Sequence, residues 1–365
     1  MNKSLYWYWM CNIKGIGQKK TAKLLDCFGD PEGVWRASEK DLSNVAILRT
    51  NDIKKIIESR DEESINIGYK RLQERNIKFI TIDDKEYPPQ LKNIYDPPFG
   101  IYNKGILPNE KKLKIAIVGA RKCTSYGKEM AKYFARELAN LGVEVISGLA
   151  RGIDAYAHQG AIEGKGKTYS VLGNGLNICY PQENISLFME VEKQGGIISE
   201  YNLDVKPNPS HFPLRNRIIS GLSDGILVIE AAKKSGSLIT AEISLEQGRE
   251  VFALPGRITD KLSEGTNEII KMGGKMVTSI EDILEEFQYI MPKYERIEEK
   301  IENKLKLLDK NEKMVYACLS LEPKYIDEIA NELKIEIQKV NHLLFILEIK
   351  GLIKQLPNKY FIINV

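Results

Sequence analysis

The sequence lacks the cysteine pattern of a disulfide framework or of a zinc site. Its five cysteines are odd in number, widely spaced and contain no Cys-x-x-Cys pair. The three histidines, His158, His211 and His342, lie far apart and have no cysteine or second histidine at ligand spacing. We therefore expect free thiols in a reducing cytoplasm and no bound metal ion.

Long apolar runs and a strong net charge are also absent. No apolar stretch approaches the ~18 residues of a membrane span, and the first ten residues lack the apolar centre of a signal peptide. The 53 basic and 50 acidic residues leave a net charge of +3, and 43% of the residues are hydrophobic. These values predict a globular, cytoplasmic protein with no membrane partner, and they exclude a protein that is basic all over.

The central part of the chain, residues 113–290, has the pattern of an α/β domain. Short apolar, β-branched runs alternate there with stretches of helical periodicity, which is typical of parallel strands covered by helices. The runs cover residues 114–119, 143–147, 168–173, 196–199, 225–231 and 250–256. The pattern predicts an extended Rossmann-like, open and mostly parallel sheet with helices on both faces.

Two segments precede this domain. Residues 1–75 contain short amphipathic helices, and Gly15 and Gly17 form a G-x-G turn typical of a helix-hairpin-helix or SAM-like domain. We favour a simple tight turn there over a phosphate-binding one. In residues 76–112, two proline pairs exclude a helix, so we expect short strands in an ordered connector or edge hairpin.

The C-terminal part is predicted to be a charged linker, residues 291–306, and a winged helix, residues 307–365. Three helical segments are followed there by two short strands around Pro357. Between Lys300 and Val365 there are eleven lysines and nine acidic residues, so we favour a structural or partner-docking role over DNA binding.

Familiar nucleotide and enzyme signatures fail in this sequence. After the first strand of the α/β domain only Gly119 stands where a dinucleotide fold needs G-x-G-x-x-G, and Arg121 occupies a position that must approach a pyrophosphate closely. The turn Gly173-Asn174-Gly175 carries no nucleophile. We therefore expect no cofactor and no catalytic residues.

Three of the predicted strands end in turns that suit a phosphate. Ligands bind at the carboxyl ends of parallel strands, and small residues, helix N-termini and arginines all favour an anion there. Helix capping explains one such turn but not three. The residues are Gly119, Arg121, Lys122 and Ser125 after the first strand, Gly148, Arg151 and Gly152 after the second, and Ser235, Gly236 and Ser237 after the fifth.

The segment 206–217 combines an aromatic ring with basic residues and contains no acid. Phe212 stands among Lys206, His211, Arg215, Asn216 and Arg217, in a turn that opens a helix at Arg215. Single-stranded nucleic acid needs such a combination, since cations follow the backbone and a ring stacks on a base. In the alternative interpretation Phe212 is a core residue and the arginines pair with Asp224 or Glu230. With three anion turns beside it, the segment favours a single-stranded DNA site.

At these residues the sequence closely resembles the DprA (Smf) family of DNA-processing proteins. The resemblance covers about residues 80–285 and includes IAIVGARKCTSYG, ISGLARGIDAYAHQGAI, HFPLRNRIISGLSDGILVIEA and SGSLITAEISLEQGREVFALPG. It implies a non-enzymatic, dimeric protein of bacterial transformation that binds and protects single-stranded DNA and helps to load the recombinase RecA. It also implies a DNA groove built from Gly119, Arg121, the 212–217 turn and the 235–237 turn.

Two further expectations depend on this resemblance. Family members often have a lysine where this chain has Pro209, and Lys206 could substitute for it. The family's dimer surface is expected near Ile269, Ile270 and Met272, although burial of these residues in the core is an equal alternative.

The competing function is that of a nucleotide hydrolase. Related Rossmann-like phosphoribohydrolases use a glycine-rich turn followed by a helical glutamate, and Glu242 follows the 235–237 turn. The turn reads Ser-Gly-Ser rather than the glycine-rich loop of those enzymes, so we favour a buried or capping carboxylate.

Overall fold

The computed structural model describes residues 1–288, 308–320 and 323–363. The chain divides into two compact units, residues 1–290 and residues 291–365. Among the described residues, no helix combines the length and the apolar character needed to cross a bilayer.

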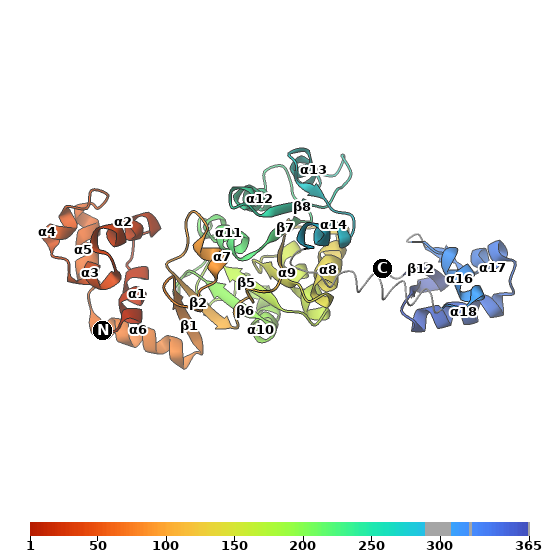
Figure 1. Ribbon diagram of the computed structural model, residues 1–365, viewed down its shortest axis with the longest axis horizontal. Helices are drawn as coiled ribbons and strands as arrows, with labels where there is room; N and C mark the ends of the chain where they lie inside the picture. Colours follow the sequence, from red (N-terminus) through yellow and green to blue (C-terminus); the bar gives the residue numbers. More distant parts are fainter. Residues whose placement is uncertain (289–307, 321–322, 364–365) are drawn as a thin grey trace. The chain divides into compact units, whose positions relative to one another are not determined.

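A nine-stranded sheet organises the first unit, in the order β1-β2-β6-β5-β4-β3-β7-β8-β9 (Figure 1). Neighbouring strands are parallel except at β1–β2 and β2–β6. The strands are β1 (Ile77–Thr81), β2 (Gly100–Gly105), β3 (Lys114–Val118), β4 (Glu144–Ser147), β5 (Thr168–Leu172), β6 (Gly196–Ser199), β7 (Gly225–Val228), β8 (Glu250–Ala253) and β9 (Lys275–Met276). The predicted extended Rossmann-like fold is confirmed.

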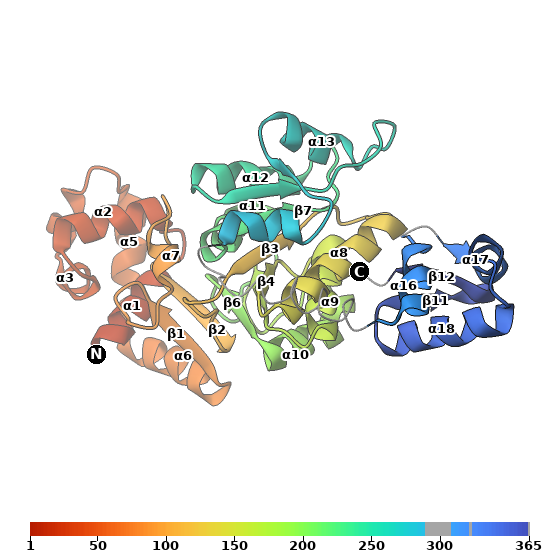
Figure 2. The same cartoon turned by 45° about the vertical axis from the view of Figure 1, so that its right-hand side comes forward.

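Helices cover both faces of this sheet, which explains why every residue of β3, β4 and β5 is buried. Figure 2 shows α8, α9 and α10 on one side of the strands and α11 and α12 on the other. The helices are α8 (Ser125–Asn140), α9 (Ile153–Glu163), α10 (Ile185–Gln194), α11 (His211–Leu222), α12 (Gly236–Glu246), α13 (Glu264–Lys271) and α14 (Glu281–Leu284), with a 3₁₀ turn η1 (Gln182–Asn184) and another, η2 (Glu285–Phe287).

Helix α11 begins four residues earlier than the sequence predicts. The segment around Phe212 was expected to be a turn ahead of a helix at Arg215, but the helix starts at His211. Pro213 lies in the first turn, where a backbone N–H has no intrahelical partner, so the proline removes no hydrogen bond of the helix.

The N-terminal helices pack against the antiparallel edge of the sheet. The Tyr8 ring lies 5.6 Å from the Phe79 ring of β1 and 6.4 Å from the Tyr102 ring of β2. Asn12 Nδ2 donates a hydrogen bond to Tyr102 Oη at 2.7 Å. The segment 76–112 therefore joins the helical part to the parallel sheet through one continuous core. The helices are α1 (Lys3–Cys11), α2 (Gln18–Phe28), α3 (Pro31–Arg36), α4 (Glu39–Ser43), α5 (Thr50–Glu58), α6 (Glu62–Glu74) and α7 (Pro89–Lys92).

The second unit is a winged helix with its own apolar core, as predicted. Its described residues form three helices and a small sheet of order β10-β12-β11, in which β10 is a strand that the sequence did not indicate. The elements are α16 (Lys310–Ala317), β10 (Lys324–Tyr325), α17 (Ile326–Leu333), α18 (Ile337–Ile349), β11 (Ile353–Leu356), η3 (Pro357–Lys359) and β12 (Tyr360–Ile363).

Candidate nucleic-acid interface

The candidate site lies where the strand order of the sheet reverses. Successive strands from β3 to β6 are added on one side of β3, and β7 then pairs with its other side. The loops after β3 and β7 therefore diverge and leave a crevice at the carboxyl ends of these strands. A pocket of about 490 Å³ occupies this position. Its lining includes Gly119, Arg121, Asp154, Tyr180, Pro209, Phe212, Arg215, Asn216, Ser235, Gly236 and Ser237.

An arginine and two aromatic rings form a stack at this pocket. The Arg121 guanidinium lies 5.1 Å from the centroid of the Phe212 ring. The Tyr180 ring stacks on Phe212 with a centroid separation of 5.6 Å and an interplanar angle of 24°. Arg121 and Tyr180 are both exposed. The stack offers a charge and a flat ring from two loops and the start of α11, which suits a phosphate and a base.

Helix α12 begins beside this stack and leaves its first amides uncapped. Its N-cap, Ser235, makes no side-chain bond to the helix and instead exchanges a hydrogen bond with Ser237, Oγ to Oγ at 2.7 Å. A Cβ built on Gly236 would meet no atom within 4 Å. The helix N-terminus is therefore open to an anion.

Glycines permit the close approach of these loops. Gly152 has φ +73°, and a Cβ there would lie 2.2 Å from the Ala120 carbonyl oxygen. A Cβ on Gly119 would lie 2.6 Å from Ile153 Cγ1, and one on Gly148 would lie 2.6 Å from the Arg215 guanidinium. At these three predicted positions only glycine allows the loops to pack this closely.

Arg215 lines the pocket but is almost fully buried. The residue is 4% exposed, and its Nη1 donates hydrogen bonds to the carbonyl oxygens of Gly148 and Val171. Burial lowers the pKa of Arg215 to about 10, although the nearby Asp154 carboxylate opposes this shift. Asp154 Oδ2 accepts a hydrogen bond from Gly148 N at 3.1 Å. Arg215 therefore ties together the ends of β4 and β5.

Arg217 points to a different part of the molecule. Its Nη2 donates to both Glu200 carboxylate oxygens at 2.8 Å, and its Nε lies 3.4 Å from Asp96. The pairing with Asp224 or Glu230 weighed from the sequence does not form. Glu230 instead accepts from Thr124 N, and Asp224 from Lys114 N. Arg217 is therefore not among the side chains brought together at the switch-point pocket.

Five other predicted residues do not line the pocket. Lys122, Ser125 and Lys206 are exposed, and Arg151 forms an ion pair with Glu183 at 2.8 Å. His211 stacks on Tyr201 with ring centroids 4.2 Å apart. Pro209, where the family often has lysine, does line the pocket.

Tyr180 is the residue that the sequence analysis missed. It follows the Gly173-Asn174-Gly175 turn after β5, which was examined only for a nucleophile. The same rule that selected the ends of β3, β4 and β7 also applies to β5 and would have included an aromatic residue there.

The remaining candidates fall outside this site. Glu242 is exposed on α12 and does not line the pocket. Ile269 is 7% exposed and belongs to the core, Ile270 packs partly against it, and Met272 is 72% exposed. Within residues 1–288, 308–320 and 323–363, no three acidic, histidine or cysteine side chains are grouped as a metal site.

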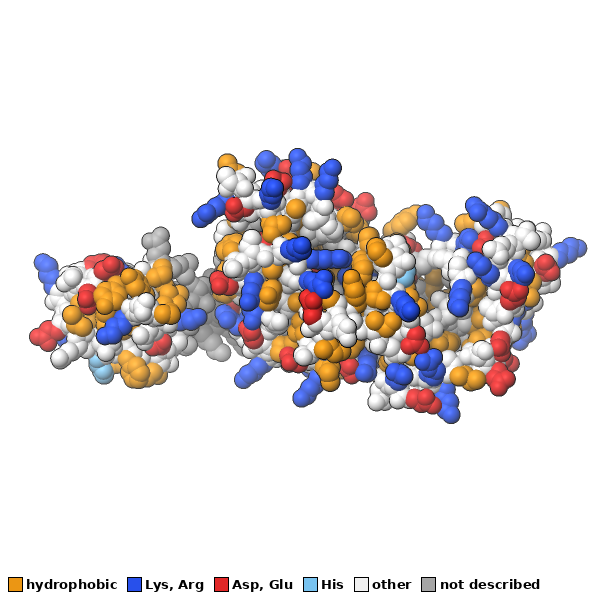
Figure 3. All heavy atoms as spheres, turned by 180° about the vertical axis from the view of Figure 1, so that it is seen from behind, with side chains coloured by type: hydrophobic (Ala, Val, Ile, Leu, Met, Phe, Trp, Pro, Cys, Tyr) orange, Lys and Arg blue, Asp and Glu red, His pale blue; other side chains and the backbone are white. Residues whose placement is uncertain are grey.

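Side chains of both charges are mixed on the surface of the molecule (Figure 3). Figure 3 shows basic and acidic side chains interspersed on the face that it presents. This distribution agrees with the net charge of +3.

Comparisons with known proteins identify the family of this chain. A family model for DNA recombination-mediator protein A matches residues 78–288, and a model for the DprA winged helix domain matches residues 302–359. Protein Smf of Escherichia coli is 42% identical over 259 residues, which cover 70% of this chain and 69% of that protein.

Two solved structures have related folds. The crystal structure of DNA processing protein A from Streptococcus pneumoniae has a TM-score of 0.68 and 33% identity, covering 78% of this chain and 99% of that one. A structure of DNA processing protein A from Helicobacter pylori, described for its single-stranded DNA binding mode, has a TM-score of 0.52 and 30% identity over 58% of this chain and 96% of that one. The fold, both family matches and these relatives agree, and the chain belongs to the DprA/Smf family of DNA-processing proteins.

Proposed function

We propose that this protein binds single-stranded DNA in the switch-point pocket and acts without catalysing a reaction. The observation that carries the proposal is the stack of Arg121, Phe212 and Tyr180 beside the uncapped start of α12. A base stacks on the exposed Tyr180 ring, while Arg121 and the α12 amides bind neighbouring phosphates. Because none of these contacts reads a base edge, binding is independent of sequence.

Family membership supports a role for the protein in the cell. We propose that the protein, as a homodimer in the cytoplasm, protects incoming single strands during transformation and helps to load the RecA recombinase onto them. The single-stranded DNA binding mode described for the Helicobacter pylori relative supports the DNA binding on which this role depends.

Binding of a labelled oligonucleotide tests the pocket through two contacts that differ in their salt dependence. Arg121→Ala removes one phosphate contact, so we expect weaker binding at moderate salt and a salt slope lower by about one. Tyr180→Leu removes a stacking surface, so we expect a loss of about 1–3 kcal/mol per base with an unchanged salt slope, and Tyr180→Phe should retain the affinity. Fluorescence anisotropy over a salt series measures both quantities.

Arg36→Ala is a matched control, because Arg36 is an exposed arginine on α3 and does not line the pocket. If Arg121→Ala and Tyr180→Leu bind as tightly as the wild type, the pocket is not the DNA site.

A further inference from the structure

The two rings of the switch-point pocket are held in place in different ways. Phe212 lies in the first turn of α11 and packs on Gly173, where a Cβ would lie 2.9 Å from its Cδ1. The Tyr180 ring is 43% exposed and stacks on Phe212. An exposed ring is not enclosed by its neighbours, so its position depends on the backbone of the loop after β5. Whatever fixes that backbone also fixes the distance between the two rings.

A tight turn leads from Tyr180 into α10. The Asn184 backbone N–H donates to the Pro181 carbonyl oxygen at 3.1 Å, across the 3₁₀ turn η1. Pro181 is buried, and Tyr180 directly precedes it. Because the turn is this compact, a displacement of Asn184 also displaces Tyr180.

The Asn184 side chain ties this turn to the loop after β4. Asn184 is the N-cap residue of α10, a position at which asparagine usually accepts a hydrogen bond from the helix, but its side chain makes no such bond. Its Nδ2 instead donates to the carbonyl oxygens of Leu149 at 3.0 Å and of Ala150 at 3.4 Å. The side chain therefore joins two loops rather than capping its own helix.

The loop after β4 presents these carbonyls in a conformation that leucine rarely adopts. Leu149 has φ +54° and is fully buried. A left-handed residue other than glycine persists only where its surroundings hold it. Asn184 binds the Leu149 carbonyl oxygen, and Arg215 Nη1 donates to the neighbouring Gly148 carbonyl oxygen at 2.8 Å. This loop is therefore a fixed support to which Asn184 attaches the turn that carries Tyr180.

An ion pair joins the same two loops but holds them less firmly. Arg151 donates to both Glu183 carboxylate oxygens, at 2.8 and 2.9 Å, and both side chains are more than half exposed. Exposed ion pairs contribute little, because water and salt screen them. Asn184 is half-buried, so its bonds carry most of the coupling between the loops.

We propose that Asn184 is a positioning residue for DNA binding, which holds Tyr180 where its ring stacks on Phe212 and receives a base. The role of the base rests on the proposed function, whereas the position of the ring does not. Without the Asn184 amide the loop has to be ordered when DNA binds, and this ordering lowers the affinity. Asn184 does not line the switch-point pocket, so the number of phosphate contacts stays the same.

A double-mutant cycle with a labelled oligonucleotide of about six nucleotides tests this role. Asn184→Ala should weaken binding on the order of fivefold, with an unchanged salt slope. In Tyr180→Leu the ring to be positioned is absent, so adding Asn184→Ala should have less than about a twofold further effect. In Arg121→Ala the loss caused by Asn184→Ala should remain in full.

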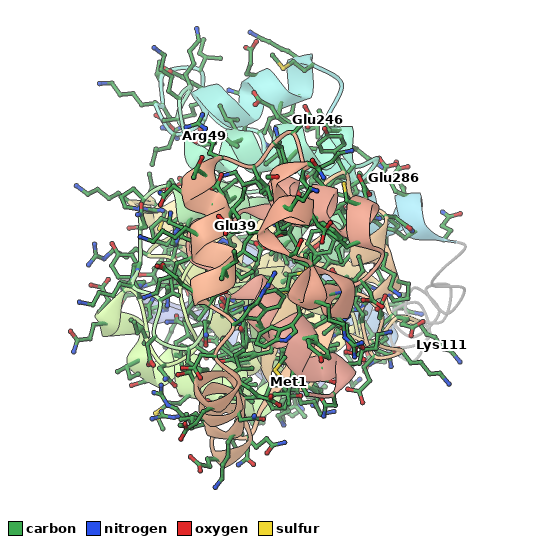
Figure 4. All side chains as sticks on the ribbon, turned by 90° about the vertical axis from the view of Figure 1, so that its left-hand side faces the viewer. Met1, Glu39, Arg49, Lys111, Glu246 and Glu286 are labelled. Atoms are coloured by element: carbon green, nitrogen blue, oxygen red, sulfur yellow. The ribbon has the colours of Figure 1, made fainter. Side chains whose placement is uncertain are left out.

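Asn12→Ala is the matched control. Asn12 is also half-buried, and its Nδ2 donates two hydrogen bonds, to the Tyr8 carbonyl oxygen at 2.6 Å and to Tyr102 Oη at 2.7 Å. It follows α1, among the N-terminal helices that Figure 4 shows in front, where Glu39 and Arg49 are labelled. The control removes bonds of the same kind away from the loop after β5, so its DNA affinity should equal that of the wild type.

Hydrogen exchange of the free protein, followed by mass spectrometry, reports on the loop without DNA. Asn184→Ala should accelerate the exchange of amides in residues 176–184 on the order of fivefold, and Asn12→Ala should not. Unchanged exchange, wild-type affinity of Asn184→Ala, or an equally large loss in the Tyr180→Leu background overturns the proposal. If Arg121→Ala and Tyr180→Leu both bind as tightly as the wild type, the proposed function fails, and the exchange result alone then decides whether Asn184 positions the loop.

Discussion

His158 is a neutral histidine inside the Rossmann-like core. It is fully buried on α9, and its Nδ1 lies 2.7 Å from Thr168 Oγ1. Thr168 Oγ1 donates to the Val145 carbonyl oxygen at 3.0 Å, so it accepts the proton on His158 Nδ1. His158 Nε2 is buried without a partner. Burial, with a smaller contribution from the nearby Arg215 charge, lowers the pKa of His158 to about 3.

This environment predicts an acid-sensitive stability that His158→Gln removes. The unfolded chain binds a proton on this histidine below about pH 6.5, whereas the folded chain does so only near pH 3. The contribution of neutral His158 to the free energy of unfolding is therefore fully present above about pH 6.5. It is lost as the pH falls toward 3, by up to about 1.4 kcal/mol per pH unit. Urea unfolding at pH 7.5, 6 and 5 should show that the stability advantage of the wild type over His158→Gln shrinks as the pH falls. A difference in unfolding free energy that stays constant with pH would contradict this prediction, because all other groups titrate alike in both proteins.

Arg215 and Arg217 illustrate what residue-level reasoning from the sequence can and cannot give. Both were grouped with Phe212 because they are close in sequence and basic. In a helix, residues two positions apart point to nearly opposite sides. Arg215 therefore reaches the carbonyls at the ends of β4 and β5, and Arg217 reaches Glu200. The helix predicted to start at Arg215 already contains both arginines, so this distinction could have been drawn from the sequence.

At the scale of elements, glycine allows the loops after β3 and β4 to pack closely against each other. The β3 and β4 loops meet where Gly152 lies against the Ala120 and Arg121 carbonyls. The start of α12, by contrast, is open around Gly236. Gly152 and Gly236 were both predicted as phosphate-binding residues. In the structure Gly152 permits two loops to pack closely, whereas Gly236 leaves the start of α12 open.

Alanine substitution should separate these roles. Gly152→Ala combines a positive φ with a Cβ 2.2 Å from a carbonyl oxygen, so we expect a loss of about 2–4 kcal/mol of stability. Gly236→Ala meets no atom and lies in the first turn of a helix, so its unfolding free energy should stay within about 1 kcal/mol of the wild type. Urea denaturation measures both values, and similar losses in the two variants would refute the assignment.

The elements themselves were largely predictable, since apolar runs of parallel strands differ clearly from amphipathic helices. Five of the six predicted strand runs begin at the first residue of the observed strand, and all six overlap β3 to β8. The pairing of β2 with β6 was not predictable, because it joins antiparallel strands almost a hundred residues apart. Tyr180 could have been selected as a residue that follows β5, but its stacking on Phe212 depends on which segments the strand order brings together.

At the scale of the whole molecule, one end of the sheet has exposed apolar side chains. The strand β9 forms this edge, and Met276 within it is 52% exposed. Met272, just after α13, is 72% exposed and Ile258 is 93% exposed. An edge strand and a group of apolar side chains of this kind favour association with a second copy. Ile269 cannot contribute directly, because it is buried in the core of its own chain.

We therefore expect Met272→Glu to shift a homodimer toward monomer. A carboxylate buried in an apolar interface has no cation to compensate for its lost hydration, and it should raise the dimer dissociation constant on the order of a hundredfold. Sedimentation velocity at micromolar concentration measures this change. Met189→Glu is the control, because Met189 is 64% exposed on α10, a helix that packs on β5 and β6, and these strands are far from β9 in the sheet. Met272→Glu should bind short oligonucleotides normally and long ones more weakly, because a dimer engages one strand at two pockets. A wild type that sediments as a monomer, or a Met272→Glu variant that remains dimeric, would exclude this edge as the interface.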